Sequence, residues 1–375
     1  MPIRLFREII LPLLFPFPCV RIDKKELIVV NISVLDERIR SYCRENRISG
    51  VLRLTVKDKI LYEGSYGYAD EETQTPFTAE SMFTLYSMSK PFCAIALMTL
   101  VDQGKVQLED HPGVYVPEAA GLDKRVTINH LLHHTSGLPD FEQTPGLAET
   151  YAPGYPRFTR SHVAELHKYP MLFDPGTKDF YANINFVLCA LIIENVSGMA
   201  YADFMSQNIF APLGMKTAVV DDEIKFIPNR VTGYRLAENQ LTPIPKCHNW
   251  MLGAGDIVGT VEDVYCLNKA IKHKLLLSEQ AWAQMLTPDP INNMGKGCRI
   301  TRWHEKRRIT HNGGAAGFRT LHIQLPEEDF DLIFLSNSGF GNARAELSEI
   351  VYEEYYGADQ KTSDFVEMDK GYAKP

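Results

Sequence analysis

The stretch TLYSMSKPFCAIALMTLVDQGK, residues 84–105, places a Ser and a Lys three positions apart at the start of a long apolar helix. Pro91 suits the first turn of that helix, where its missing N–H costs no hydrogen bond, and Gly104 ends the helix. Residues i and i+3 share one face of a helix, so Ser87 and Lys90 are predicted to lie side by side.

The pair has two readings. A Ser hydroxyl needs a base before it attacks a carbonyl at neutral pH, and a Lys can be that base where burial and neighbouring charges lower its pKa. The N–H groups at a helix start also favour a developing oxyanion. In the alternative reading, Ser87 caps the helix and Lys90 is a solvated charge. S-x-x-K is common by chance, so this tetrapeptide alone does not decide.

Composition narrows the class of protein. The chain has 375 residues, 45% hydrophobic and 23% charged, which exceeds the usual single core of about 250–300 residues and predicts two lobes or a large insertion. A net charge of -8 without a basic stripe argues against a nucleic-acid partner. The seven Cys include no C-x-x-C pair, which fits a reducing compartment better than a disulfide framework. We therefore expect a cytoplasmic protein.

Residues 1–30 are expected to be an N-terminal extension. Two Arg precede an uncharged run from Ile9 to Val20, which is too short to span a bilayer as a helix and contains three Pro. The run also lacks the small residues of a signal-peptide cleavage site. Its charged start and apolar run keep export or membrane attachment as the alternative.

The order of predicted elements indicates an α+β fold, an α/β sandwich. Helical periodicity over 33–46 leads into two alternating runs around KDK, which predict a hairpin; short helices fill 110–240, and strands with a closing helix follow. We expect an antiparallel sheet built from both chain ends and flanked by helices, with a mainly helical lobe inserted. The predicted bounds are 31–84 and 297–360 for the sheet lobe, 85–296 for the helical lobe, and 361–375 for a tail. The Ser87 helix then lies at the junction of the lobes, a common place for a cleft.

Two further stretches bear on the Ser–Lys pair. PGTKDFYANINF carries Tyr181 and Asn183 just before an apolar helix, and RRITHNGGAAGF carries His311, Gly313 and Gly314 at the end of a candidate strand. Small residues there let a substrate approach the strand backbone closely.

From about residue 34 to 357 the chain resembles the serine β-lactamase and penicillin-binding-protein superfamily, in its class C, esterase-like and D-aminopeptidase-like branch. The resemblance rests on six stretches in the family's order and approximate spacing: FTLYSMSKPF, LVDQGKVQLEDHPGVYVPE, VTINHLLHHTSGLPDF, PGTKDFYANINFVLCALIIENVSG, GAGDIVGTVEDV and HNGGAAGF. It implies the β-lactamase/transpeptidase-like fold.

The resemblance also implies roles for five residues. Ser87 matches the acylated nucleophile, and Lys90 matches the Lys that helps to deprotonate it. Tyr181 matches the Tyr that shuttles protons, and Asn183 matches the amide that holds the substrate or Lys90. The oxyanion hole would use the backbone N–H groups of Ser87 and Gly314.

The third motif departs from the pattern of many β-lactam-recognising members. Those members begin it with Lys, as Lys-Thr-Gly, whereas this chain has His311-Asn312-Gly313. A neutral His keeps a hydrogen bond but loses the permanent cation. This form resembles esterase, peptidase and amidase members, so efficient β-lactam hydrolysis is less expected. Arg319, shortly downstream, is a candidate to replace the charge.

Other patterns argue against other chemistries. HLLHH places His130, His133 and His134 at a spacing that a helix could present to zinc, but no nearby Glu completes H-E-x-x-H, so we expect no metal. The signature G-x-S-x-G of α/β-hydrolases is absent. No phosphate-binding loop is present, so no nucleotide and no other cofactor is expected.

The expected function is that of a metal-independent serine hydrolase. It would act through an acyl-enzyme on an ester, an amide or a D-amino-acid peptide, so the partner is a small-molecule or short-peptide substrate. A class C-like β-lactamase or D,D-peptidase is the alternative within the family, and a catalytically silent binding or scaffold protein is the alternative outside it. The presence of Ser87, Lys90 and Tyr181 together favours the enzyme. Residues 141–160 suggest a lid, and the oligomeric state stays open.

Overall fold

The computed structural model describes residues 30–144, 160–222, 225–238, 240–244, 251–303, 306–339 and 341–357. The chain divides into a large unit, residues 43–344, and a small unit formed by its two ends, residues 1–42 and 345–375. The large unit holds both the sheet and the helical lobe. The predicted N-terminal extension up to residue 29, the C-terminal tail and residues 145–159 of the predicted lid lie outside the described residues.

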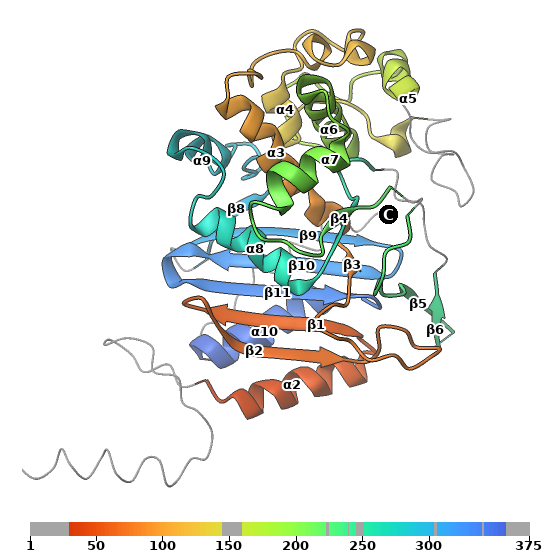
Figure 1. Ribbon diagram of the computed structural model, residues 1–375, viewed down its shortest axis with the longest axis vertical. Coiled ribbons are helices and arrows are strands. Elements are labelled where there is room, and N and C mark those ends of the chain that lie inside the picture. The colour runs from red at the N-terminus through yellow and green to blue at the C-terminus, as the bar shows by residue number, and fades with distance from the viewer. Residues whose placement is uncertain are drawn as a thin grey trace, which may run out of the picture. The chain divides into compact units, whose positions relative to one another are not determined.

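The central sheet of the large unit has six antiparallel strands and is built from both chain ends, as predicted (Figure 1). Its order is β2 (Lys59–Tyr66), β1 (Gly50–Val56), β11 (Phe330–Ser336), β10 (Phe318–Leu325), β9 (Lys306–Ala315) and β8 (Arg299–Trp303). The hairpin around KDK is confirmed, with Lys57 and Asp58 at its turn in the left-handed region of φ.

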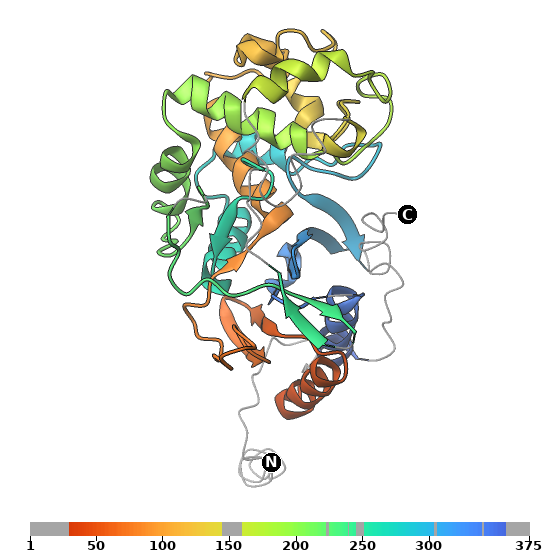
Figure 2. The ribbon, with the colours of Figure 1, turned by 90° about the vertical axis from the view of Figure 1, so that its right-hand side faces the viewer.

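The helical lobe fills the middle of the chain and gathers beyond the β8–β9 edge of the sheet (Figures 1 and 2). Its helices are α3 (Lys90–Asp102), α4 (Ile128–His133), α5 (Arg160–Glu165), α6 (Asn183–Ser197) and α7 (Tyr201–Met205), which continues into a π-helical turn (Ser206–Phe210). α3 and α6 are apolar on nearly every face and form the centre of the lobe's core.

Two small sheets inside this middle segment were not predicted, because their strands are only two to four residues long. One joins β3 (Phe83–Thr84), β7 (Ile257–Gly259) and β4 (Val219–Val220), and the other pairs β5 (Tyr234–Ala237) with β6 (Gln240–Pro243). β3 leads directly into the Ser87 segment, so the first of these sheets positions that segment.

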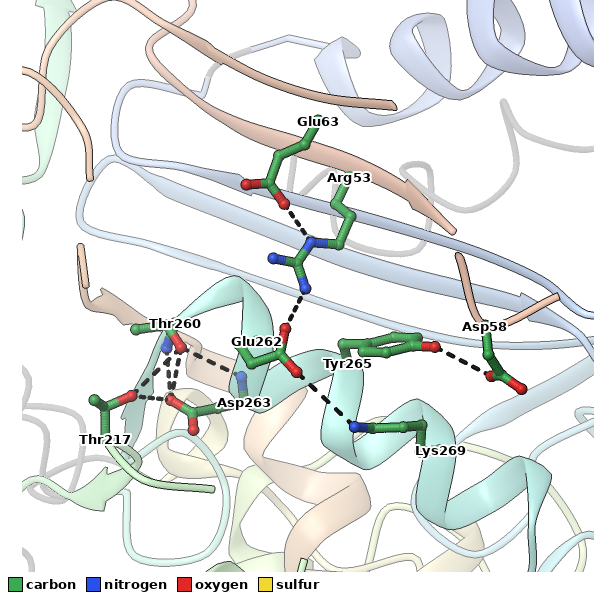
Figure 3. A network of polar contacts seen from close by, with 9 residues as sticks. All are labelled: Arg53, Asp58, Glu63, Thr217, Thr260, Glu262, Asp263, Tyr265 and Lys269. Atoms are coloured by element: carbon green, nitrogen blue, oxygen red, sulfur yellow. Dashed lines mark hydrogen bonds and ion pairs between the residues drawn. The ribbon is translucent and has the colours of Figure 1, made fainter. Parts of the chain in front are cut away.

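Helix α8 (Val261–Lys272) forms polar contacts with the sheet. Helix α9 (Glu279–Met285) follows α8 in the chain. Arg53, a buried residue of β1, donates to Glu63 of β2 and, at 2.5 Å, to Glu262 of α8 (Figure 3). Tyr265 of α8 donates to Asp58 at 3.1 Å. A buried guanidinium needs such acceptors, since an uncompensated buried charge is strongly destabilising.

The small unit contains most of α2 (Ile32–Glu45), close to its predicted bounds, and most of α10 (Ala343–Tyr356), the predicted closing helix. Arg38 of α2 forms ion pairs with Glu353 at 2.6 Å and Glu354 at 2.7 Å.

In the described residues, no single helix has the length and apolar composition to cross a membrane. Only α6 taken together with residues Tyr201–Phe210 meets those criteria, and this pair is bent by 81°.

Strand β9 lies directly against the segment that carries Ser87. Thr320 of β10 donates from its hydroxyl to the Leu85 carbonyl at 2.9 Å. Its cross-strand partner on β9 is Gly313, where a Cβ would overlap the same carbonyl and come within 3.1 Å of the Met88 nitrogen. The lack of a side chain at Gly313 therefore allows this approach.

We predict that Gly313→Ala lowers the free energy of unfolding by about 1–3 kcal/mol, the usual range for overpacking, because the new Cβ meets a fixed backbone carbonyl. The measurement is the urea midpoint at unchanged slope. The control is Gly314→Ala, one residue along, whose Cβ would meet only the Arg319 side chain, at 3.1 Å. Equal midpoints for the two variants would show that β9 does not need this close approach.

Candidate active site

Ser87 lies on a 3₁₀ turn (Tyr86–Ser89) that runs into α3, three residues before the α-helix begins at Lys90. The helix was predicted to include Ser87, but side chains at i and i+3 also eclipse on a 3₁₀ turn, so the predicted pairing with Lys90 survives. Tyr86, just before Ser87, has φ of 48°. Non-glycine residues in the left-handed region are uncommon and cluster at functional sites.

The Ser87 turn is anchored to β7 on both sides. The Leu85 N–H donates to the Ile257 carbonyl at 2.8 Å, and the Ile257 N–H donates to the Ser89 hydroxyl at 3.0 Å. The backbone around Ser87 is therefore fixed by its neighbours before any substrate binds.

Lys90 is fully buried, and its ammonium has three acceptors. Nζ lies 3.2 Å from Ser87 Oγ, 2.9 Å from Asn183 Oδ1 and 2.8 Å from the Ala254 carbonyl. Burial lowers the pKa of Lys90 to about 7. At neutral pH a large fraction of Lys90 is then the free amine, which keeps two donors for Asn183 and Ala254 and offers its lone pair to the Ser87 hydroxyl.

The Ala254 carbonyl is held by a tight turn that the sequence reading did not single out as functional. The carboxylate of Asp256, buried two residues on, accepts from the Gly253 N–H at 2.8 Å. Burial raises the pKa of Asp256 to about 7. Gly253 has φ of 72°, and a Cβ there would come within 2.9 Å of Cys93 Sγ on α3.

Tyr181 lies beside Lys90 and is held by the ring of His134. The two rings stack with centroids 4.3 Å apart, and Lys90 Nζ lies 4.7 Å from the centre of the Tyr181 ring. His134 Nδ1 accepts from the Ala182 N–H at 3.2 Å. Burial lowers the pKa of His134 well below its usual value, so the ring is neutral.

Asn183 links Lys90 to a second residue that sequence reasoning missed, Asp140. Asn183 Oδ1 accepts from Lys90, and its Nδ2 donates to Asp140 Oδ2 at 3.0 Å. Asp140 Oδ1 accepts from the Ile184 N–H at 3.1 Å, in the first turn of α6. The only signal was its place in the stretch VTINHLLHHTSGLPDF.

His311 lies at the point where β9 loses one of its neighbours. β8 pairs with β9 only as far as Thr310, so residues 311–315 have β10 on one side and no described strand on the other. Burial lowers the pKa of His311 well below its usual value. Its Nδ1 lies 2.7 Å from the Asn312 carbonyl, which only accepts, so Nδ1 carries the proton and Nε2 is an acceptor. The ring centroid is 6.4 Å from that of Tyr181.

Arg319 is not brought to Ser87. Gly313 and Thr320 share the sheet face that meets Leu85, so Gly314 and its partner Arg319 occupy the opposite face. The Arg319 guanidinium donates to the Phe318 carbonyl at 2.9 Å and covers Gly314 on that face. Strand alternation could have indicated this, since Arg319 pairs with Gly314.

Arg299 is a cation near the site that sequence reasoning missed. It is exposed, and its cross-strand partner is Thr310, so it starts from the same face of the sheet as Arg319 but at the point where β8 stops pairing with β9. Gly297, two residues before it, packs against the Lys90 backbone: a Cβ there would lie 3.0 Å from the Lys90 carbonyl oxygen. The charge of Arg299 makes a small contribution, after burial, Lys90 and neighbouring histidines, to the lowered pKa of both His134 and His311.

The three histidines of HLLHH have separate partners. His130 Nδ1 accepts from the Thr127 N–H at 3.2 Å, His133 Nε2 lies 3.4 Å from Lys296 Nζ, and His134 stacks on Tyr181. Among the described residues, no three His, Cys, Asp or Glu side chains group so as to hold a metal ion.

Besides the Ser87–Lys90 pair, four of the other six predicted positions gather around that pair, in chain order Tyr181, Asn183, His311 and Gly313. Gly314 follows Gly313 along β9, and Arg319 lies on the other face of the sheet. The arrangement offers a hydroxyl, a tunable amine, a phenol and a free strand edge, which together suit acyl transfer.

The chain is similar to known proteins of one family. The family described as Beta-lactamase matches residues 35–355. Penicillin-binding protein 4* of Bacillus subtilis (strain 168) is 29% identical over 317 residues, which are 78% of this chain and 69% of that protein. D-aminopeptidase of Gluconobacter oxydans (strain 621H) is 23% identical over 295 residues, 77% of this chain and 55% of that protein.

A solved structure shows the same fold. The D-amino acid amidase from Ochrobactrum anthropi SV3, complexed with L-phenylalanine, superposes with a TM-score of 0.73 at 23% identity, covering 87% of this chain and 99% of that one. The predicted α+β, β-lactamase/transpeptidase-like fold is confirmed. With a family match that spans nearly all the described residues, the chain belongs to the Beta-lactamase family and is a serine hydrolase of the superfamily that includes the penicillin-binding proteins.

Proposed function

We propose that Ser87 is the nucleophile, that Lys90 is its base, and that the substrates are small amides or esters, with D-amino acid amides and short D-amino-acid peptides foremost. The observation that carries the proposal is the contact between Ser87 Oγ and a fully buried Lys90 whose pKa is lowered to about 7. A base is most effective when its pKa lies near the working pH.

The chemistry proceeds in two steps. Neutral Lys90 takes the Ser87 proton as Oγ bonds to the substrate carbonyl carbon, and the oxyanion is stabilised by the N–H groups of Ser87 and Gly314. The proton passes through Tyr181 to the leaving nitrogen or oxygen as its bond to carbon breaks. Water then attacks the acyl carbon and gives its proton to the same relay, which returns one proton to Ser87 Oγ as the acid leaves.

The substrate class is supported by the third motif and by relatives. His311 is buried and neutral, so it provides an acceptor where many β-lactam-recognising members have a cation. A D-aminopeptidase and a D-amino acid amidase are among the similar proteins. We therefore expect amides and esters to acylate Ser87 faster than penicillins do.

The nucleophile is tested with Ser87→Ala. The variant should show no covalent adduct by intact-mass spectrometry after incubation with a fluorophosphonate, while wild type gains one adduct. Ser89→Ala is the matched control: this hydroxyl accepts from the Ile257 N–H, so its loss should weaken the fold but leave Ser87 labelled. An adduct on Ser87→Ala at another residue would remove Ser87 from this role.

The charge at the cleft is tested with Arg299→Ala and Arg319→Ala. Two p-nitrophenyl esters of equal size are compared, one neutral and one carrying a carboxylate. Arg299→Ala should lower kcat/KM for the carboxylate ester by about threefold to fivefold relative to the neutral one, since an exposed charge contributes up to about 1 kcal/mol. Added salt should shrink the effect. Arg319→Ala should leave the ratio unchanged.

A lower ratio of kcat/KM for the carboxylate ester to that for the neutral ester in Arg319→Ala, with an unchanged ratio in Arg299→Ala, would contradict this placement of charge. A penicillin turned over faster than both esters by wild type would favour the β-lactamase alternative.

A further inference from the structure

We propose that Asp140 is a positioning residue of the hydrolase described above: its carboxylate fixes the orientation of the Asn183 amide and so decides which atom of that amide faces Lys90. The inference rests on the proposed role of Lys90 as the base for Ser87. It assigns a function to a buried carboxylate that touches neither the nucleophile nor the proposed substrate edge.

The geometry is a chain of four hydrogen-bonded groups. Asp140 Oδ1 accepts from the Ile184 N–H at 3.1 Å, and Oδ2 accepts from Asn183 Nδ2 at 3.0 Å. Asn183 Oδ1 accepts from Lys90 Nζ at 2.9 Å, and Nζ lies 3.2 Å from Ser87 Oγ. Asp140 is only 7% exposed, so no solvent shell replaces these contacts.

The Asn183 amide has two chemically different ends, and Asp140 selects between them. A carboxylate only accepts hydrogen bonds, so it must face the NH₂ group, which leaves the carbonyl oxygen for Lys90. The N-terminus of α6 stabilises the negative charge of Asp140, because the N–H groups of the first turn point toward it. The same carboxylate thus caps a core helix and orients an amide of the site.

Asp140 is one of several titratable groups around Lys90. Burial lowers the pKa of Lys90, and the charge of Asp140 opposes that effect, as does the charge of Asp256. Burial also raises the pKa of both carboxyls. Six titratable groups face Lys90. They are Cys93 from α3, Asp256 from the 253–256 turn, Tyr181 from the segment before α6, His134 and Asp140 from the segment after α4, and His311 from β9.

The substitution Asp140→Asn changes two things in the same direction. It removes a negative charge that stabilises the Lys90 ammonium. It also replaces one acceptor oxygen by an NH₂ group, and when that group faces Asn183 Nδ2, the Asn183 amide must turn and present its own NH₂ to Lys90. Both changes disfavour the protonated amine, so Lys90 should lose its proton at lower pH.

The double variant Asp140→Asn with Asn183→Asp moves the carboxylate one step along the chain. The new Asn accepts from the Ile184 N–H and donates to the new Asp, which then contacts Lys90 directly. The bond between the two side chains and the bond from the Ile184 N–H each keep a donor and an acceptor, but the ammonium now touches a negative charge. Lys90 should lose its proton at higher pH than in wild type.

The experiment follows Lys90 itself by NMR, through the ¹³Cε signal of labelled lysine between pH 5 and 11. The signal is assigned by its absence from Lys90→Arg, which also separates it from Lys296, another buried lysine. Asp140→Asn should titrate about one pH unit below wild type and the double variant about one unit above it, a roughly tenfold change in the protonation equilibrium in each direction.

Opposite shifts in the two variants support the inference. An unchanged Lys90 titration in either folded variant overturns the inference, and Asp140 would then act only as a cap of α6. If Asp140→Asn does not fold, the double variant still decides, because its titration must rise.

Covalent labelling of Ser87 is measured on the same samples. Wild type that is not labelled at Ser87 contradicts the proposed function, while the NMR titration still tests what Asp140 does to Lys90. Where labelling occurs, its rate should rise with pH as Lys90 becomes neutral, so the rise moves to lower pH in Asp140→Asn and to higher pH in the double variant.

Discussion

The site depends on one buried ammonium with three acceptors. Removing a charge from water costs several kcal/mol unless hydrogen bonds replace its hydration. The acceptors of Lys90 come from the turn before α3, from the start of α6 and from the turn before β7. Those three segments must therefore pack together before Lys90 is satisfied, which couples assembly of the site to assembly of the helical lobe's core.

Close packing around Lys90 also produces its chemistry. Gly253 brings the Ala254 carbonyl against α3, and Gly313 brings the edge of β9 against the Ser87 turn. This packing excludes water, and the loss of hydration lowers the pKa of Lys90 into the range of a base at neutral pH. The charge of Asp140, which accepts a hydrogen bond from Asn183, opposes part of that shift.

The sequence predicted the parts of this arrangement that depend on local spacing. Ser87 and Lys90 are three residues apart, Tyr181 and Asn183 precede an apolar helix, and the chain ends read as strands; the structure has each of these features. The contacts around Lys90 that join distant segments were harder to predict, because sequence spacing does not reveal them. An example is the contact of Asp140 with Asn183, 43 positions away.

The choice of cation near the site also needed the structure. Arg319 lies closer to His311 in sequence than Arg299 does, and strand pairing with Gly314 and Thr310 starts both arginines on the same face of the sheet. What separates them is that the charge of Arg299 reaches His134 and His311, while the Arg319 guanidinium is bonded to the Phe318 carbonyl. Arg299 lies where β8 stops pairing with β9, and no sequence pattern predicted where that pairing ends.

The most direct test of the central claim, that a buried Lys90 with a pKa near 7 activates Ser87, is the second-order rate of Ser87 labelling by a fluorophosphonate as a function of pH. The rate should rise tenfold per pH unit well below neutrality and level off above about pH 7.5, since only neutral Lys90 accepts the proton. A rate that does not change between pH 5 and 9 would contradict the account.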